Sequence, residues 1–413
     1  MSQNTGLPTL KDIETKGKAV LVRVDFNVPT NSAGEVLDST RIEAAKDTIL
    51  ELRGQGAKII LISHMGRPGG EVQEKFSLKH VLSAVEEVLG QPVAFCEHTV
   101  GDKAEAAVNQ LNPGQILLLE NLRFDPGEKS NDEAFAQRLA KLADLYVNDA
   151  FSAAHRAHAS TAAVTHYLPA YAGRLMEREV KALTDALEDP ERPALALVGG
   201  AKVSTKLDLL KNIVSKVDYL VLGGGMANTF LEAKGHTIGQ SLSESDMVDT
   251  VQEIMEEAGT QGCEIILPEI VMVAKELKDN AAAADKPLAE VADDDKILDL
   301  GAAACSEIES VIAQCQTVLW NGPLGVFEVP PFDRATTRIA RYVAREVQNG
   351  SLKAIAGGGD TVSALNQTGV AGQMSYVSTA GGAFLEWLEG KDLPAIERLR
   401  EIKRERDSSC PAA

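Results

Sequence analysis

The sequence has few cysteines, no long apolar run and fewer basic than acidic residues. Only five of its 413 residues are cysteine, and none lies in a Cys-x-x-Cys pair. This scatter disfavours a disulfide framework and a zinc site and favours a reducing compartment. No apolar run approaches the roughly 18 residues of a membrane span, and the N-terminus lacks the apolar core of a secretory signal. These absences predict a cytoplasmic protein with no membrane partner.

The charge balance is strongly acidic. Lysine and arginine number 41 against 60 aspartates and glutamates, giving a formal net charge of -19. Such a chain repels nucleic acid and anionic membranes, so neither is an expected partner. Any anionic ligand must be held by a local basic site that overcomes the global field.

Length and pattern predict an α/β protein with two domains. A chain of 413 residues, 44% hydrophobic, is too long for one ordinary core. Short apolar runs alternate with amphipathic stretches, and most runs lack polar alternation, as buried parallel strands do. The runs predicted to be strands are Ala19–Val28, Lys58–Ile62, Pro92–Cys96, Gln115–Leu119, Leu145–Val147, Ala194–Val198, Tyr219–Leu222, Glu264–Leu267, Lys296–Leu300, Thr317–Trp320, Lys353–Ala356 and Ser375–Val377. This βα alternation predicts two doubly wound parallel-sheet lobes joined by a helix and hinge.

Helices are expected between the strands. Ser77 precedes an apolar stripe that ends at Gly90 and Pro92, which is typical of a capped helix with a glycine-proline stop. Similar patterns cover Arg41–Gln55, Ser204–Lys216, Met226–Lys234 and Thr361–Gln367.

The predicted boundary lies near the middle of the chain. Apolar residues at helical spacing over Gly173–Asp189 end in Asp189-Pro190, a strong helix stop. We interpret residues 173–189 as a helix joining two lobes. The alternative is a surface helix within one large sheet.

Basic residues follow the first-half strands. Because ligands bind beyond the carboxyl ends of parallel strands, side chains that follow these runs are expected to converge. Those expected on one face are Arg41, His64, Arg67, Arg123 and Arg156. Guanidinium groups suit phosphate and carboxylate, so this cluster predicts a site for a small, highly charged anion. Taken singly, each could be a solvated surface group, and His155 and His158 could be structural.

Glycines follow the second-half strands. The segments are Gly199-Gly200, Gly223-Gly224-Gly225, Gly322, Gly357-Gly358-Gly359 and Gly381-Gly382. Glycine lets backbone approach a phosphate, and a following helix start binds anions. Neither a P-loop nor a Rossmann fingerprint is present. Lys202 and Lys206 are four residues apart, so at a helix start they are expected to share a face toward phosphates. Asp360 is expected to reach a phosphate-bound Mg²⁺ or to cap a helix, and the two roles are compatible.

Seven motifs occur in the order of one known family. They are Arg23–Pro29, Ser63–Pro68, Glu120–Phe124, Asn148–His158, Gly199–Lys206, Trp320–Glu328 and Gly357–Thr361. Together they resemble phosphoglycerate kinase from about Lys11 to about Pro394. The resemblance implies Mg²⁺-dependent, reversible transfer between ATP and 3-phosphoglycerate, giving ADP and 1,3-bisphosphoglycerate, by a protein expected to be monomeric. The residues do not choose between ATP and GTP.

The resemblance also implies roles for individual residues. The acid would be bound by Asp25, Phe26, Asn27, Arg41, His64, Met65, Gly66, Arg67, Arg123 and Arg156. The nucleotide would be bound by Lys206, Glu328, Gly358, Gly359, Asp360 and Thr361, with Asp360 also at Mg²⁺. Arg41, Lys202 and Lys206 would be catalytic, and closure of the two lobes would bring Arg41 and Lys202 to the transferring phosphoryl group.

The implied organisation is an acid-binding lobe over residues 1–172, the joining helix over 173–189 and a nucleotide lobe over 190–393. A tail over residues 394–413 would pack back on the first lobe, with its end from Ser408 to Ala413 expected to be disordered.

Two positions depart from the family pattern. Ala380 replaces a glycine of Ser-Thr-Gly-Gly-Gly, and Ser152 replaces the glycine of Asn-Asp-Ala-Phe-Gly. Neither is expected to touch a side chain with an assigned role, although Ala380 puts backbone approach at its turn in question. The remaining alternatives are a kinase for an acid without phosphate, a non-catalytic binding protein and, disfavoured by its missing fingerprint, a nicotinamide dehydrogenase.

Overall fold

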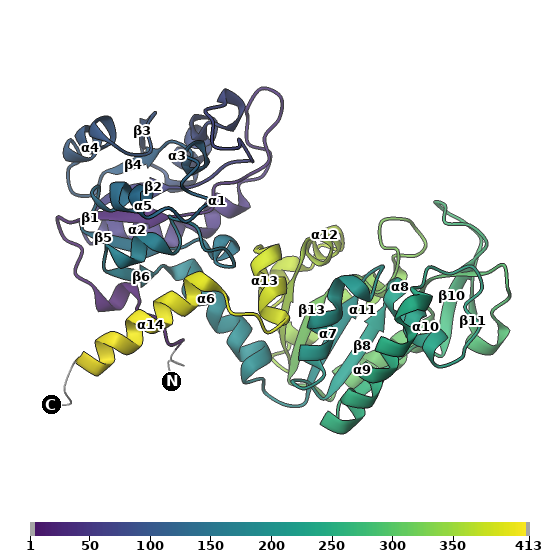
Figure 1. Cartoon of the computed structure of the whole chain (residues 1–413). Helices are drawn as coiled ribbons and strands as arrows, with labels where there is room; N and C mark the ends of the chain where they lie inside the picture. Colours follow the sequence, from purple (N-terminus) through teal and green to yellow (C-terminus); the bar gives the residue numbers. More distant parts are fainter. Residues whose placement is uncertain (1–4, 410–413) are drawn as a thin grey trace. The chain divides into compact units, whose positions relative to one another are not determined.

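Residues 5–409 are described by a computed structural model, and they divide into two compact units (Figure 1). The first unit runs to Lys181 and resumes at Asp392, and the second spans Ala182–Lys391. The division falls inside the segment predicted as a joining helix over 173–189. That segment consists of α6 (Arg174–Leu183) and a π-helical turn at Thr184–Glu188.

The first unit is built on six parallel strands in the order β3-β4-β2-β1-β5-β6. Their bounds are β1 (Ala19–Arg23), β2 (Lys58–Ile62), β3 (Ala94–Cys96), β4 (Ile116–Leu119), β5 (Leu145–Asn148) and β6 (Ala170–Ala172). The five predicted strands of this half are present, but the first ends at Arg23 instead of Val28. The short strand β6 was not predicted, because three residues give no readable period.

Helices cover this sheet. They are α1 (Thr40–Ala44), α2 (Lys46–Gly54), α3 (Leu82–Leu89), α4 (Asp102–Asn109) and α5 (Glu133–Ala140). The helix predicted over Arg41–Gln55 is therefore two helices, α1 and α2. Before α3, Ser77 accepts a hydrogen bond from the Lys79 amide at 3.2 Å, and Gly90 ends the helix at φ 66°. Both signals in the sequence are confirmed.

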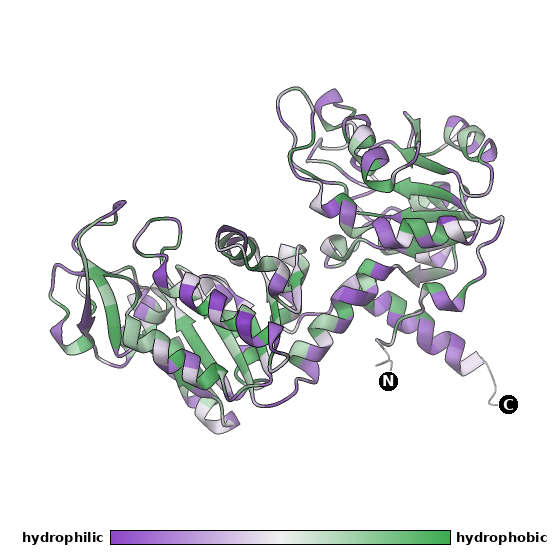
Figure 2. Ribbon diagram, turned by 180° about the vertical axis from the view of Figure 1, so that it is seen from behind, coloured by the Kyte–Doolittle hydropathy of each residue, from purple (hydrophilic) through white to green (hydrophobic). Residues whose placement is uncertain are grey.

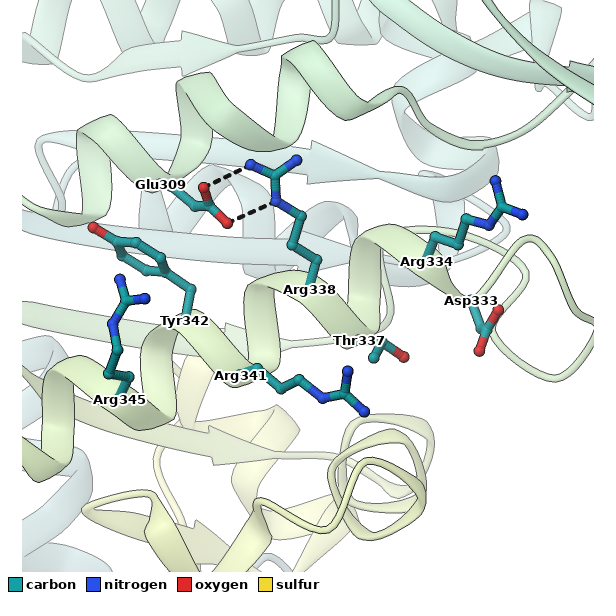
Figure 3. Close-up of a pocket in the computed structure, with 8 residues that line it drawn as sticks. All are labelled: Glu309, Asp333, Arg334, Thr337, Arg338, Arg341, Tyr342 and Arg345. Carbon is teal, nitrogen blue, oxygen red and sulfur yellow. Dashed lines mark hydrogen bonds and ion pairs between the residues drawn. The ribbon is translucent and has the colours of Figure 1, made fainter.

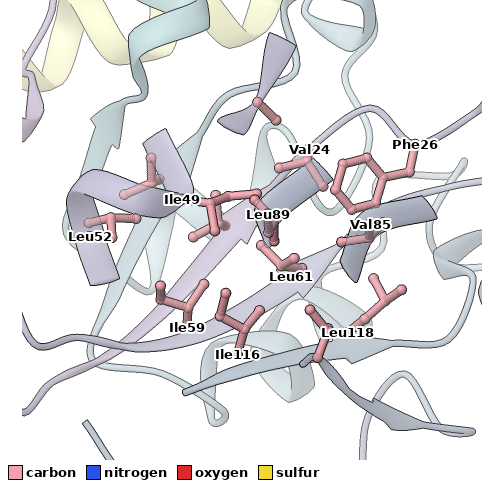
Figure 4. Packing of buried hydrophobic residues seen from close by; sticks show 14 of the residues in the cluster. Val24, Phe26, Ile49, Leu52, Ile59, Leu61, Val85, Leu89, Ile116 and Leu118 are labelled. Atoms are coloured by element: carbon pink, nitrogen blue, oxygen red, sulfur yellow. The ribbon is translucent and has the colours of Figure 1, made fainter. Parts of the chain in front are cut away.

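One hydrophobic cluster of the first unit lies between the sheet and helices that include α2 and α3. Ile49 and Leu52 of α2 and Val85 and Leu89 of α3 pack against buried strand residues (Figure 4). The strand residues labelled there are Ile59, Leu61, Ile116 and Leu118, and Val24 directly follows the end of β1. Truncating a core leucine to alanine costs about 2–5 kcal/mol, so this cluster holds the strand ends that carry the polar side chains.

The C-terminal helix α14 (Pro394–Ser409) packs on the first unit. The Ala395 amide donates to the Ala154 carbonyl at 3.1 Å, and the Arg406 guanidinium lies 4.1 Å from the Tyr171 ring centre. Ser408 and Ser409 are helical, so the disorder expected there is wrong for these two residues. The rest of that expectation, residues 410–413, lies outside the described residues.

The second unit contains a second parallel sheet and a small antiparallel one. The parallel order is β15-β14-β13-β7-β8-β9. Its strands are β7 (Ala194–Gly199), β8 (Tyr219–Gly223), β9 (Glu264–Ile266), β13 (Thr317–Asn321), β14 (Lys353–Gly357) and β15 (Tyr376–Ser378). Figure 2 shows the strands of both large sheets as hydrophobic, which is expected of strands buried on both faces.

The antiparallel sheet contains β10 (Ile270–Ala274), β11 (Ala283–Pro287) and β12 (Lys296–Leu300) in the order β11-β10-β12. The strand predicted over Lys296–Leu300 exists, but it belongs here and not to the parallel sheet. Strands β10 and β11 were not predicted. β11 is an exposed edge with Asp285, Lys286 and Pro287, residues that rarely mark a strand.

The helices of the second unit are α7 (Leu207–Ile213), α8 (Gly224–Ala233), α9 (Val248–Gln261), α10 (Ala302–Ile312), α11 (Arg334–Gln348), α12 (Gly359–Gln367) and α13 (Gly381–Leu388). The helix predicted over Ser204–Lys216 begins as a 3₁₀ turn at Ser204–Lys206 and continues as α7. None of the helices within residues 5–409 has the length and apolarity to cross a bilayer.

Candidate functional site

Four adjacent strands of the first unit end at one edge. In the sheet order β4-β2-β1-β5, these strands lead into Asn121, His64, Asp25 and Asp149. All four residues are buried. The polar groups that the sequence placed after separate strands are therefore brought together by strand order.

Arg41 is anchored beside Asp25. Its Nη1 donates to Asp25 Oδ2 and to the Asn27 carbonyl, both at 3.0 Å. The Asn27 side-chain oxygen accepts from the Gly66 amide at 2.9 Å, which ties the loops after β1 and β2 together. Within residues 5–409 only Nη1 of Arg41 has an acceptor, so its other donors are available to a ligand.

His64 is held in one tautomer by a buried arginine. Arg23 Nη2 lies 3.0 Å from His64 Nδ1, and arginine can only donate. Burial lowers the pKa of His64 well below its usual range, and the charges of Arg23 and Arg123 act in the same direction. The imidazole is therefore neutral, accepts at Nδ1 and carries its proton on Nε2, where it can donate to an anion.

Arg123 brings further positive charge to this edge. Its Nη1 donates to the Gly66 carbonyl at 2.6 Å, while its buried Nε has no acceptor within residues 5–409. Burial lowers the pKa of Arg123 to about 10, and repulsion from Arg23, Arg156 and Arg67 contributes. Like charges that repel one another across a partly dry site are relieved by a multivalent anion.

The remaining predicted acid-site residues have different positions. Arg67 is exposed, and Arg156 donates from Nε to His155 Nε2 at 2.8 Å. The side chains of Phe26 and Met65 are 0% and 4% exposed and belong to the hydrophobic core. Phe26 therefore offers no exposed surface to a ligand and Met65 very little, and the Phe26 amide donates to Ser63 Oγ at 2.8 Å.

Sequence reasoning missed two residues of this site. Arg23 is the last residue of β1 and is 1% exposed. Because it lies inside the predicted strand Ala19–Val28, the sequence gave no reason to expect its guanidinium to contact other residues of the site. Ser152 was expected to touch no side chain with a role, and this is wrong. Its hydroxyl donates to Asp25 Oδ2, the same oxygen that accepts from Arg41.

In the second unit, four adjacent strands end in or beside glycine, and the neighbouring β15 ends at Ser378, three residues before Gly381. The order β15-β14-β13-β7-β8 places all of these ends at one edge. A Cβ on Gly199 would lie 1.8 Å from the Pro323 carbonyl oxygen, and Gly322 has φ 108°. The backbones after β7 and β13 thus approach so closely that no side chain fits.

Lys206 lies at this edge. Its Nζ donates to the Gly199 carbonyl at 2.7 Å and to the Asn321 carbonyl at 3.0 Å. Burial lowers its pKa to about 8, which the charge of Asp360 partly offsets. Lys202 is exposed and precedes the 3₁₀ turn, so the two lysines do not share a helix face as predicted.

The loop after β14 opens helix α12. Gly358 is the N-cap at φ 97°, and Asp360 lies in the first turn without capping it. The predicted alternative of Asp360 as N-cap is therefore wrong. Thr361 is 2% exposed and accepts from the Gly322 amide at 2.7 Å, which joins the loops after β13 and β14. Glu328 and Gly359 are exposed.

The described residues offer only limited ligation for a metal. Across residues 5–409, no group of three or more His, Cys, Asp or Glu is placed to hold an ion. Mg²⁺ commonly takes one or two carboxylates and completes its shell with phosphates and water. The carboxylate of Asp360 is exposed at a helix start and does not cap the helix, so it fits a Mg²⁺ site of this kind.

Ala380 does not obstruct its turn. It has φ -98° and ψ 52°, a conformation open to L-residues, and is the N-cap of α13. The glycine usual at this position is not required by the backbone angles here.

Comparison with known proteins identifies the family of the chain. The family model described as phosphoglycerate kinase matches residues 10–391. The chain is 54% identical over 391 residues to the phosphoglycerate kinase of Rhodospirillum centenum, covering 95% of this chain and 98% of that one. It is 55% identical over 392 residues to that of Azorhizobium caulinodans, with coverage of 95% and 98%.

Solved structures give the same result. Phosphoglycerate kinase from Coxiella burnetii superimposes with a TM-score of 0.89 at 42% identity, covering 96% of this chain and 99% of that one. The enzyme from Pyrococcus horikoshii gives a TM-score of 0.79 at 28% identity, with coverage of 97% and 100%. The chain therefore belongs to the phosphoglycerate kinase family.

Proposed function

We propose that the protein catalyses reversible phosphoryl transfer between ATP and the carboxylate of 3-phosphoglycerate, giving ADP and 1,3-bisphosphoglycerate, in glycolysis and gluconeogenesis. The observation that carries the proposal is the contrast between two strand edges. One gathers arginines and a neutral histidine, and the other gathers close-packed glycines and a lysine of lowered pKa. A monomer in the cytoplasm is part of the proposal.

The first edge suits a small acid with two anionic ends. Arg41, Arg123 and His64 each retain a donor that the described residues do not engage. Asp25 and Asn27 orient Arg41 and the Gly66 loop. Arg67 and Arg156 would complete the contacts, with Phe26 and Met65 supporting the site from the core.

The second edge suits a nucleotide. Amides of Gly358, Gly359 and Thr361 at the start of α12 would face phosphate oxygens, and Glu328 would contact the nucleoside. Lys206 supplies a cation held by two backbone carbonyls. Asp360 would hold Mg²⁺, which when bound neutralises charge on the nucleotide phosphates.

No general base is required. A carboxylate oxygen of the acid attacks the terminal phosphorus of ATP, the bond from phosphorus to the bridging oxygen breaks, and ADP leaves with that electron pair. No proton moves, so catalysis rests on positioning and on charge neutralisation by Arg41, Lys202 and Lys206. Because Arg41 and Lys202 belong to different units, transfer requires the two units to close around the substrates, which also excludes water.

The test is a coupled assay with ATP and 3-phosphoglycerate, with acetate and aspartate as alternative acids. Arg41→Ala should lower turnover about 100-fold or more, because a lost charge contact in the transition state costs roughly 3 kcal/mol, with ATP affinity changed less than about twofold. Arg41→Lys should recover part of the loss, and Arg53→Ala, at an exposed arginine of α2, should have no effect.

Three outcomes would contradict the proposal. Equal turnover with acetate or aspartate would identify a different acyl-phosphate kinase. No turnover with any acid would indicate a binding protein. Equal loss of turnover and ATP affinity in Arg41→Ala would remove Arg41 from the transfer step.

A further inference from the structure

Helix α11 carries a row of arginines that the proposed reaction does not use. Arg334, Arg338, Arg341 and Arg345 follow one another at intervals of four, three and four residues. At 3.6 residues per turn this spacing places them along one face, over about 16 Å of helix. The opposite face, including Ile339 and Val343, is buried.

The row borders a groove of ≈ 520 Å³ (Figure 3). None of the residues proposed to bind acid or nucleotide lines it. The groove lining carries these four arginines against two carboxylates, Glu309 and Asp333, so it is locally basic in a chain whose net charge is -19. The groove is therefore a separate basic feature.

Two of the four arginines are already engaged. Arg338 donates to both carboxylate oxygens of Glu309, at 2.8 and 2.7 Å, and anchors α11 to α10. Arg345 lies 4.5 Å from the Tyr342 ring centre and donates to Glu346. These contacts hold the walls of the groove and leave little capacity for a ligand.

Arg334 and Arg341 are exposed, and within residues 5–409 neither has a hydrogen-bond or ion-pair partner. Seven residues, or about 10.5 Å of helix rise, separate them. Two unpaired guanidiniums at this spacing suit a linear anion with charge at both ends, because each fork binds phosphate oxygens in pairs.

A second copy of the chain would also be anionic and could meet this row with acidic residues. Two molecules of net charge -19 repel each other strongly at low salt, and exposed ion pairs contribute about 1 kcal/mol or less. A small oligophosphate meets far less repulsion and concentrates its charge between two arginines. Charge density therefore favours the small ligand.

We propose that the groove along α11 is a binding site for an oligophosphate chain, held by Arg334 and Arg341. The chain can belong to inorganic triphosphate or to a nucleoside triphosphate. Tyr342 at the groove wall gives a nucleoside a surface that inorganic triphosphate does not use.

The test is calorimetric titration with inorganic triphosphate and, separately, with ATP. Arg334→Gln and Arg341→Gln should each raise the dissociation constant of triphosphate about three- to tenfold, and the double variant should lose this binding event. Arg53→Gln, an exposed arginine of the first unit, should leave it unchanged. Phosphoryl transfer without added triphosphate should be the same in all these variants, which separates the groove from the catalytic site.

Two arms distinguish the sources of the phosphate chain. A second ATP-binding event that is lost in the double variant and weakened in Tyr342→Leu indicates a nucleoside triphosphate. The same loss for inorganic triphosphate alone indicates an inorganic chain. Either result supports the site.

The inference is overturned if the double variant binds triphosphate as the unchanged protein does, or if Arg53→Gln weakens it equally. It is also overturned if sedimentation shows self-association that Arg341→Gln abolishes while triphosphate binding stays intact. That result would assign the row to a second copy of the chain.

Discussion

Lys206 should take up a proton when nucleotide binds. Two backbone carbonyls and partial burial hold its amine in a site where its pKa is lowered to about 8, from an ordinary 10.5. Burial disfavours the ammonium form, and nearby phosphate favours it. Nucleotide binding at the adjacent glycine edge should therefore raise the pKa again.

The size of the effect follows from these values. At about pH 8.5 roughly a quarter of free Lys206 is protonated, and nearly all would be once the pKa returns to its ordinary value, an uptake of about 0.75 proton. At about pH 7 about nine-tenths is already protonated, so the uptake falls to about 0.1.

Calorimetric titration of ADP in buffers of different ionisation enthalpy measures this quantity directly. The slope of observed enthalpy against buffer enthalpy gives the protons exchanged, whatever the affinity. Lys206→Met should abolish the uptake at about pH 8.5, and Lys211→Met, an exposed lysine of α7, should retain it. Uptake that is absent in the unchanged protein, or that survives in Lys206→Met, would refute the assignment of Lys206 to the phosphates.

Three further predictions concern other residues. Ser152→Ala removes a donor to Asp25 Oδ2, so steady-state kinetics should show the KM for 3-phosphoglycerate raised about three- to tenfold and that for ATP unchanged; equal changes in both would contradict a role at Asp25. Asp360→Asn should raise the Mg²⁺ concentration for half-maximal activity about tenfold without lowering Tm, because Asp360 caps no helix; an unchanged Mg²⁺ requirement would remove it from the metal. Burial raises the pKa of Asp149 to about 6, so between about pH 4 and 6 the folded chain binds more protons than the unfolded one. The contribution of Asp149 to the free energy of unfolding therefore increases as pH falls through this range, by up to about 3 kcal/mol. Urea titrations should show a smaller increase in Asp149→Asn, and a pH profile identical to that of the unchanged protein would refute the prediction.

Local sequence determined much of the secondary structure and the chemistry at strand ends. Apolar runs without alternation predicted all the strands of the two parallel sheets except β6, and Ser77 and Gly90 marked a helix start and stop. β6 is short and β11 carries edge residues, so side-chain pattern is a weak signal for both, whereas the missed β10 is an apolar run of five residues, as long as β1. The helix predicted over Arg41–Gln55 is two helices, and its apolar period gave no sign of the break.

The sequence pattern could not predict residue roles that depend on contacts between distant parts of the chain. The sequence predicts no contact between Ser152 and a site residue, because a serine in a loop does not indicate which residue it will meet. Its partner Asp25 is 127 residues away in the chain. Arg23 was read as part of a strand, yet its guanidinium sets the tautomer of His64 from the neighbouring strand. The helix start places Gly358, not Asp360, at the cap, so the capping role of Asp360 is wrong and its role at Mg²⁺ stays a prediction.

The sequence by itself determined that this protein has arginine-bearing strand ends in one half and glycine-bearing ends in the other, because strand periodicity and residue chemistry are local properties. Only the tertiary structure decided which of these ends are neighbours. Strand order in each sheet placed His64 beside Arg23 and Gly322 beside Gly199, and burial at those edges lowered the pKa values of His64 and Lys206. Strand order and the desolvation of a side chain depend on residues far apart in the chain, so neither can be predicted from the local sequence pattern.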